Sequence, residues 1–198
     1  MSTIQIEWLN IQTLTDADLA LVAAALPQRY GRATAFVRRD DYLRCIGAGL
    51  LMLRLGLRSE SDIEYGPHGK PTIPYLPQFN ISHSGDWVVC AASNAPIGVD
   101  IERIQPDNLV VAQEVFVPQE LNWMHQCDSD QRFCQLWTLK EAVMKFFGKG
   151  LHLEPKSFNV MPFVQGKALT MDGATIYAHT EIRDDYTLSV VSTEHVKA

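Results

Sequence analysis

The chain has 198 residues, of which 46% are hydrophobic and 20% are charged, with 12 glycines and 10 prolines. This composition excludes collagen-like, low-complexity and disordered proteins, and the length suits one compact unit or two small half-domains. Acidic residues outnumber basic ones by 23 to 17, and the net charge of −6 argues against general binding to a nucleic-acid backbone. A local basic patch is compatible with this charge, but we expect no nucleic-acid partner.

The sequence also argues against a membrane protein. Its longest clean apolar stretch, residues 19–26, is far shorter than the roughly 20 residues that cross a bilayer. The first seven residues lack the basic start and apolar block of a secretory signal. We therefore expect a cytoplasmic protein with no membrane partner. The four cysteines form no Cys-x-x-Cys pair, and two lie in apolar segments, which favours buried, reduced thiols.

Two helices are expected in the first third of the chain. The first opens behind Thr15 and Asp16 and stops at Pro27. The second covers residues 34–55 and buries an apolar face made of Phe36, Leu43, Ile46, Leu50 and Leu53. Between residues 66 and 85, glycines and spaced prolines forbid a helix and predict a looping path of the kind that contacts a ligand.

Two strands are expected next, over residues 87–92 and 97–101, where small and β-branched apolar residues flank a turn. Two short helices, over about 107–115 and 118–125, and a longer one over 130–147 should follow. Glycines after this segment end the last helix. The remaining residues alternate short apolar runs with turn signals, which is typical of an antiparallel sheet.

The two halves of the sequence resemble each other. Gly69-Lys70 precedes Phe79-Asn80-Ile81 by the interval at which Gly148-Lys149 precedes Phe158-Asn159-Val160. The run that starts at Asp86-Trp87 likewise resembles the run at Asp185-Tyr186. Chance among short motifs is one explanation. The other is an internal duplication, which predicts an α+β fold of two similar half-domains, residues 1–104 and 105–198, related by a pseudo-two-fold axis with a ligand cleft between them. Such an internal pseudo-dimer needs no second chain, so we expect a monomer.

Four charged side chains suggest a metal site. Asp100 and Glu102 lie two residues apart on an expected strand, so both project from one face while Val99 and Ile101 point into the core. Glu141 and Lys145 lie one turn apart on the expected long helix, a spacing that is by itself a common surface salt bridge. A solvated strand end is the alternative for the first pair. Together, three hard oxygen ligands beside a lysine suit Mg²⁺ that completes its shell from substrate phosphates.

Candidate phosphate-binding groups lie earlier in the chain. Ser82 and His83 offer a hydroxyl and an imidazole just before a strand, and guanidinium groups flank the first long helix at Arg29, Arg32 and Arg44. A structural histidine and a solvated arginine face are the alternatives. The sequence therefore offers both a metal clamp and a polyphosphate clamp.

These residues resemble the Sfp-type 4′-phosphopantetheinyl transferases. The resemblance covers most of the chain, in order, and rests on Gly69-Lys70-Pro71, Phe79 to Gly85, Gly98 to Glu102, Phe116 with Glu120, and Trp137 through Lys145 to Gly150. Each piece alone is weak, whereas the ordered set is specific. The family fold, two similar α+β halves with coenzyme A bound between them, agrees with the internal repeat.

The resemblance implies a role for each matched residue. Asp100, Glu102 and Glu141 would hold Mg²⁺ against the coenzyme A pyrophosphate, which Lys145 would stabilise. Ser82 and His83 would contact phosphates, with Arg29, Arg32 and Arg44 joining His83 around the 3′-phosphate, while Gly69, Lys70 and Pro71 line the adenine. Family members often have lysine at the positions of Arg29 and Arg32, so the positive charge is kept there.

The reaction implied is transfer of 4′-phosphopantetheine from coenzyme A to a serine hydroxyl of an apo acyl, peptidyl or aryl carrier protein, which releases adenosine 3′,5′-bisphosphate. Glu141 is the expected base, and a metal-bound water is the competing assignment. Two other classes stay open. A non-catalytic coenzyme A or nucleotide-binding module would not need three carboxylates, and another Mg²⁺-dependent phosphotransferase would need its own phosphate loop, which the sequence lacks.

The carrier is expected to dock just after Glu102. Pro106 and Asp107 set up a helix start there, and its first turn places apolar residues at the mouth of the expected cleft. The alternative is that this face packs on the core. We assign carrier binding to Leu109, Val110 and Gln113.

Overall fold

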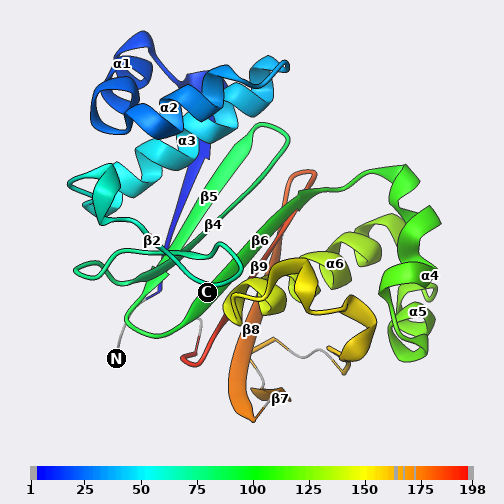
Figure 1. The fold of residues 1–198 in the computed structure, drawn as a ribbon. Coiled ribbons are helices and arrows are strands. Elements are labelled where there is room, and N and C mark those ends of the chain that lie inside the picture. Colours follow the sequence, from blue (N-terminus) through cyan, green and yellow to red (C-terminus); the bar gives the residue numbers. More distant parts are fainter. Residues whose placement is uncertain (1–3, 163–164, 167, 172, 196–198) are drawn as a thin grey trace.

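Antiparallel strands form two main sheets in the computed structural model shown in Figure 1, which describes residues 4–162, 165–166, 168–171 and 173–195, and only the backbone of 107–109. The first sheet has the order β1-β5-β4 and the second the order β6-β9-β8-β7. The strands are β1 (Gln5–Asn10), β4 (Gln78–Ser84), β5 (Trp87–Ser93), β6 (Ile97–Arg103), β7 (Ala168–Met171), β8 (Ala174–Arg183) and β9 (Tyr186–Ser192). Two short strands, β2 (Glu64–Tyr65) and β3 (Pro71–Thr72), pair beside them. The expected α+β class is confirmed.

Helices pack against both sheets (Figure 1). The first sheet carries α1 (Asp16–Ala25), α2 (Pro27–Thr34) and α3 (Arg39–Leu55), and the second carries α6 (Ser129–Phe146). A separate cluster of buried side chains fills each of these helix–sheet layers. A third cluster, which includes Val89, Val99 and Leu188, joins β5, β6 and β9 and therefore ties the two sheets to each other. No helix among the described residues is long and apolar enough to span a membrane.

The start of α1 was predicted from local sequence and is confirmed. The backbone N–H of Asp18 donates to the Thr15 hydroxyl (3.2 Å), and the N–H of Thr15 donates to the Asp18 carboxylate (2.9 Å). The helix ends before Pro27, as expected, but Pro27 opens a further helix, α2, that the sequence analysis missed. Glu60, more than 30 residues away, accepts the N–H groups of Gln28 and Arg29 at 2.7 Å each and so caps this helix.

Two other sequence predictions in this half were wrong. The long helix α3 begins at Arg39 rather than at 34, because the N–H groups of Ala35 and Phe36 close a turn onto the last carbonyls of α2. Phe36 lies outside the helix and is 50% exposed instead of buried. Residues 78–84 form strand β4 rather than a loop. They lie beyond Pro77, the last proline of the 66–85 segment, and pair along their whole length with β5.

The rest of the chain follows the sequence prediction more closely. The strand expected at 97–101 is β6, and the long helix expected at 130–147 is α6. The expected helix at 107–115 is mostly 3₁₀, over Pro106–Val111, with a short α4 at Ala112–Val115, and the next helix is α5 (Pro118–Met124). The antiparallel sheet expected at the end of the chain is confirmed by β7, β8 and β9.

The two sheets share a strand pattern that agrees with one of the two sequence correspondences, that of Asp86-Trp87 with Asp185-Tyr186. The other is not matched, because residues 79–81 lie in β4 whereas residues 158–160 lie in no strand. The order β1-β5-β4 corresponds to β6-β9-β8, with β5 and β9 as the central strands of the two sets. The N–H of Ile11 donates to the Asp86 carbonyl (2.8 Å), and the N–H of Ile104 donates to the Asp185 carbonyl (2.7 Å). These hydrogen bonds lie at corresponding places and support the hypothesis of duplication. The division at residues 104 and 105 and the pseudo-two-fold axis stay predictions.

Candidate active site

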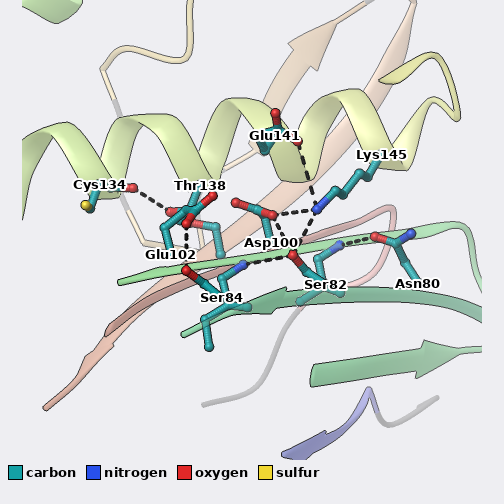
Figure 2. Close-up of polar contacts among 12 residues, drawn as sticks. Asn80, Ser82, Ser84, Asp100, Glu102, Cys134, Thr138, Glu141 and Lys145 are labelled. Atoms are coloured by element: carbon teal, nitrogen blue, oxygen red, sulfur yellow. Dashed lines mark hydrogen bonds and ion pairs between the residues drawn. The ribbon is translucent and has the colours of Figure 1, made fainter. Parts of the chain in front are cut away.

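Gly98 allows helix α6 to lie directly on strand β6. A Cβ atom at this position would lie 2.1 Å from the carbonyl oxygen of Ala142 and 2.4 Å from the backbone nitrogen of Phe146. Only glycine permits backbone atoms to approach this closely. The close approach places Glu141 and Lys145 of α6 beside Asp100 of β6 (Figure 2).

A buried ion pair fixes α6 from its other side. The Lys140 ammonium lies 3.0 Å from the Glu120 carboxylate of α5, and both side chains are fully buried. Lys140 also donates to the carbonyls of Pro155 (2.7 Å) and Phe158 (2.8 Å), which satisfies its remaining protons. Because Lys140 precedes Glu141, these contacts also fix the position of the helix that carries the acidic site.

Lys145 joins the acidic residues of the two elements. Its ammonium donates to Asp100 Oδ1 at 2.5 Å and to the Ser82 hydroxyl at 3.0 Å, and it lies 3.9 Å from the Glu141 carboxylate. Asp100 is almost fully buried, and its second oxygen, Oδ2, has no hydrogen-bond partner among the described residues. The site therefore holds a buried carboxylate oxygen that is free to accept a further cationic or donor group.

The three carboxylates carry more negative charge than the single lysine balances. Burial, followed by the neighbouring Asp100, raises the pKa of Glu102 to about 7, although a hydrogen bond from Ser84 acts in the opposite direction. Burial and Asp100 also raise the pKa of Glu141 above its usual value, whereas Lys145 lowers it. A bound cation would relieve this repulsion.

Side chains, rather than backbone pairs, connect β4 to β6 across the two sheets. Asn80 Oδ1 accepts the N–H of Val99 (2.8 Å), and the Ser82 and Ser84 hydroxyls accept the N–H groups of Ile101 (3.4 Å) and Arg103 (3.0 Å). The partner numbers rise together, so the two strands run in the same direction. Ser82 then donates to Asp100 (2.7 Å), and Ser84 donates to Glu102 (2.8 Å), as Figure 2 shows. We call this set of contacts the β4–β6 seam.

The sequence analysis missed the seam. Ser82 was assigned to phosphate contact, whereas Asn80 and Ser84 were treated only as parts of the same motif. The signal in the sequence was the recurrence of three small polar residues, Asn80, Ser82 and Ser84, at every second position, which places them on one face of β4. The partners of these side chains are 18 or 19 residues away, so no local pattern identified them.

A basic pocket lies on the other side of β4. Its volume is about 190 Å³, and its lining includes Arg29, Arg44 and His83. Arg44 Nε donates to the Gly85 carbonyl (2.8 Å), and its Nη1 lies 2.7 Å from the Asp41 carboxylate. Desolvation, and then the charges of Lys145 and Arg44, lower the pKa of His83. The structure thus brings together three of the four groups expected at the 3′-phosphate.

The other predicted nucleotide contacts are placed differently. Arg32 points toward Glu60 at 4.0 Å, is 55% exposed and does not line the basic pocket. Lys70 donates to the carbonyl of Ile97 (2.8 Å), where β6 begins, and to that of Phe146 (3.2 Å), where α6 ends. Burial lowers the pKa of Lys70 to about 8. Gly69, with φ of +83°, turns the chain before Pro71 enters β3.

The region expected to bind the carrier is described in part. The side chain of Leu109 lies outside the described residues, whereas Val110 is 85% exposed and Gln113 is also exposed. A pocket of about 230 Å³ lies beside this segment and is lined by Glu102, Arg103, Gln105, Val111, Val115, Phe133 and Trp137. It extends from an acidic residue of the site to α4. Sequence reasoning did not assign Val111 or Trp137 to any site.

The donor atoms of the acidic residues are of the type that binds a hard divalent cation, but they are not already arranged around one position. Among the described residues, no group of three or more histidine, cysteine or acidic side chains is arranged to hold a metal ion. The available donors are carboxylate oxygens, the type that Mg²⁺ prefers, and the unpartnered Oδ2 of Asp100 is one of them. Glu141 and Lys145 would have to reorient for the three carboxylates to share one ion.

Comparison with known proteins identifies the family. The model of the 4′-phosphopantetheinyl transferase superfamily matches residues 96–191. A 4′-phosphopantetheinyl transferase of Bacillus subtilis is 35% identical over 71% of this chain and 67% of its own length. The transferase ffp of the same species is 40% identical over 79% of this chain and 73% of its own length. The chain belongs to this superfamily.

It is therefore a transferase enzyme. The 4′-phosphopantetheinyl transferase Sfp of Bacillus subtilis (strain 168) is also similar, with 37% identity over 68% of this chain and 65% of its own length. The segment that the superfamily model matches contains β6, α6 and most of β9, and so includes Asp100, Glu102, Glu141 and Lys145. The basic pocket and the β4 side of the seam lie outside that segment.

Proposed function

We propose that this chain transfers the 4′-phosphopantetheine group of coenzyme A to a serine hydroxyl of an apo carrier protein, in a Mg²⁺-dependent reaction that releases adenosine 3′,5′-bisphosphate. The observation that carries the proposal is the meeting of Asp100, Glu102, Glu141 and Lys145 on β6 and α6, with the basic pocket on the neighbouring strand β4. Phosphoryl transfer needs positioning and charge neutralisation more than covalent chemistry from the protein.

The acidic residues would hold the divalent cation. Asp100, Glu102 and Glu141 supply the oxygen donors, and the ion would neutralise charge on the pyrophosphate of coenzyme A. Lys145, which donates to Asp100 in the described arrangement, would turn to the pyrophosphate oxygens when the cation takes over that carboxylate. Its ammonium would then stabilise negative charge on the departing adenosine 3′,5′-bisphosphate.

The acceptor serine needs a base. Glu141 is our assignment, because its raised pKa favours proton uptake at a pH where an ordinary glutamate stays ionised. The pKa of Glu102 is raised as well, but its Oε2 already accepts the hydrogen bond of Ser84 at 2.8 Å. A metal-bound water that passes the proton on is the competing assignment.

The rest of the donor would be bound by the first half of the chain. Arg29, Arg44 and His83 would hold the 3′-phosphate in the basic pocket, with Arg32 at its outer side, while Gly69, Lys70 and Pro71 would lie along the adenine. We further propose that the two halves face each other across the ligand as a monomer, and that the exposed Val110 and Gln113, with Leu109, meet the carrier.

Mass spectrometry of an apo carrier protein tests the function. We expect incubation with this chain, coenzyme A and Mg²⁺ to add one phosphopantetheine group to the carrier. Omission of the chain, addition of EDTA, or a carrier whose acceptor serine is alanine should each prevent the gain. A complete set of apo carriers that all keep their mass in the full reaction would contradict the proposal.

A further inference from the structure

Ser84 is engaged at both its donor and its acceptor. The hydroxyl accepts the N–H of Arg103 at 3.0 Å and donates to Glu102 Oε2 at 2.8 Å. Both partners lie at the end of β6. The Ser84 side chain therefore connects the last residue of strand β4 to Glu102, which lines the 230 Å³ pocket. Figure 2 shows Ser84 below Glu102 at one end of the cluster.

The two serines of the seam differ in what else holds their carboxylates. Asp100 accepts a hydrogen bond from Ser82 and a second one from Lys145. Glu102 has no ion-pair partner within 4.0 Å among the described residues, and the hydrogen bond that fixes its carboxylate comes from Ser84. A glutamate has three side-chain torsions, so without this bond Glu102 would be free to rotate toward solvent.

We propose that Ser84 is a positioning residue that holds Glu102 in the orientation in which the acidic cluster binds a divalent cation. This inference rests on the proposed function. Hydrogen-bond partners of metal-binding carboxylates orient the ligand, and their loss typically weakens metal binding by about 10- to 100-fold. Ser84 acts through Glu102 and needs no contact with substrate.

The test measures cation binding without transfer. Mn²⁺ is titrated into the protein with coenzyme A and no carrier, and electron paramagnetic resonance distinguishes free from bound Mn²⁺. We expect Ser84→Ala to raise the Mn²⁺ dissociation constant by about tenfold, and Ser84→Thr, which keeps the hydroxyl, to bind within about twofold of wild type. In transfer assays, Ser84→Ala should need a correspondingly higher Mg²⁺ concentration for half-maximal rate.

Asn80→Ala is the matched control within the seam. Asn80 also accepts a β6 N–H, that of Val99 at 2.8 Å, but no contact of its side chain reaches a carboxylate in the described structure. We expect this variant to lower the melting temperature at least as much as Ser84→Ala while leaving the Mn²⁺ dissociation constant within about twofold of wild type.

Three results would overturn the inference: unchanged Mn²⁺ affinity in Ser84→Ala, equal weakening in Asn80→Ala, or equal weakening in Ser84→Thr. The binding readout keeps this outcome separate from the transfer activity. A wild-type chain that modifies carriers while Ser84→Ala binds Mn²⁺ normally rejects only the role of Ser84. A chain that modifies no carrier while Ser84→Ala weakens Mn²⁺ binding rejects only the proposed function.

Discussion

Lys145 lies nearer to Asp100 on the neighbouring strand than to Glu141 one turn away on its own helix. The distances from its ammonium are 2.5 Å to Asp100 Oδ1 and 3.9 Å to Glu141 Oε2. The contact between helix α6 and strand β6 is thus closer than the usual ion pair between a glutamate and a lysine four residues apart on one helix. Lys145 therefore pairs mainly with the buried Asp100, and the charge of Glu141 is left available for another partner.

Asp100→Asn tests this arrangement. The amide keeps the shape and an acceptor for Ser82 and Lys145, but it removes the charge that a cation would need, which should cost about 100-fold or more in transfer rate. We expect the melting temperature of the variant to differ little from that of wild type. Initial rates of carrier modification and thermal unfolding by circular dichroism measure the two effects. A variant with nearly normal turnover at ordinary Mg²⁺ concentrations would remove Asp100 from the metal site.

Gly98→Ala should disrupt the contact that brings the two elements together. Its Cβ would lie within 2.1 Å of the Ala142 carbonyl oxygen and within 2.4 Å of the Phe146 nitrogen, so helix α6 must move away. We expect a loss of about 3 kcal/mol or more in the free energy of unfolding and a large loss of transfer activity. Urea denaturation and the transfer assay measure both.

Gly31→Ala is the matched control for this prediction. Gly31 lies inside α2, and a Cβ there would meet no atom within 4 Å. Alanine favours a helix over glycine, so this variant should be as stable as wild type or more stable by up to about 1 kcal/mol. Comparable destabilisation by both substitutions would show that the close contact at Gly98 is not what the fold requires.

Elements whose signals lie within a few residues could be predicted from the sequence. The start of α1 depends on Thr15 and Asp18, three residues apart, and was predicted correctly. Helix α2 was missed because its cap, Glu60, comes from more than 30 residues away, and because a proline both ends one helix and begins the next. Strand β4 was taken for a loop because glycines and prolines dominate residues 66–77, although residues 78–84 alternate polar and apolar side chains and pair along their length with β5.

The site residues show the same difference between local signals, which the sequence contains, and contacts between distant elements, which it does not. The spacing of Asp100 and Glu102 placed them on one face of a strand, and that of Glu141 and Lys145 placed them on one face of a helix. The meeting of these two faces depends on the missing side chain of Gly98, which the sequence analysis had only as part of a motif. The hydrogen bonds of the seam join two sheets, so their partners are fixed by tertiary packing and not by any local period.

The stability of the protein at alkaline pH should depend on Lys70. Its pKa is about 8 in the folded chain because it is buried, whereas an unfolded lysine titrates near 10.5. Between these values the unfolded chain binds more protons than the folded chain, so the free energy of unfolding gains a contribution from Lys70 as the pH rises. That contribution is lost as the pH falls through about 8.

The comparison with Lys70→Met isolates this contribution from other alkaline titrations. From pH 7.5 to pH 10, we expect the free energy of unfolding of wild type to rise by about 2 kcal/mol relative to that of the variant. Urea denaturation at matched ionic strength measures the difference at each pH. Parallel pH curves for the two proteins would mean that Lys70 titrates alike in its folded and unfolded states.

The basic pocket should recognise the donor through its 3′-phosphate. Arg29, Arg44 and His83 line a pocket separate from the acidic cluster, and a charge-assisted hydrogen bond contributes roughly 1.5–3 kcal/mol. Coenzyme A should therefore bind at least about tenfold more tightly than dephospho-coenzyme A, as measured by calorimetry with Mg²⁺ and no carrier. Arg29→Gln should reduce this ratio mainly by weakening the binding of coenzyme A, because dephospho-coenzyme A offers no 3′-phosphate for the guanidinium to bind. Arg54→Gln removes an arginine that pairs with Glu7 at 2.7 Å, outside the pocket, and should leave the ratio unchanged. Equal affinity of wild type for the two donors, or an equal ratio in Arg29→Gln, would show that these arginines serve another purpose.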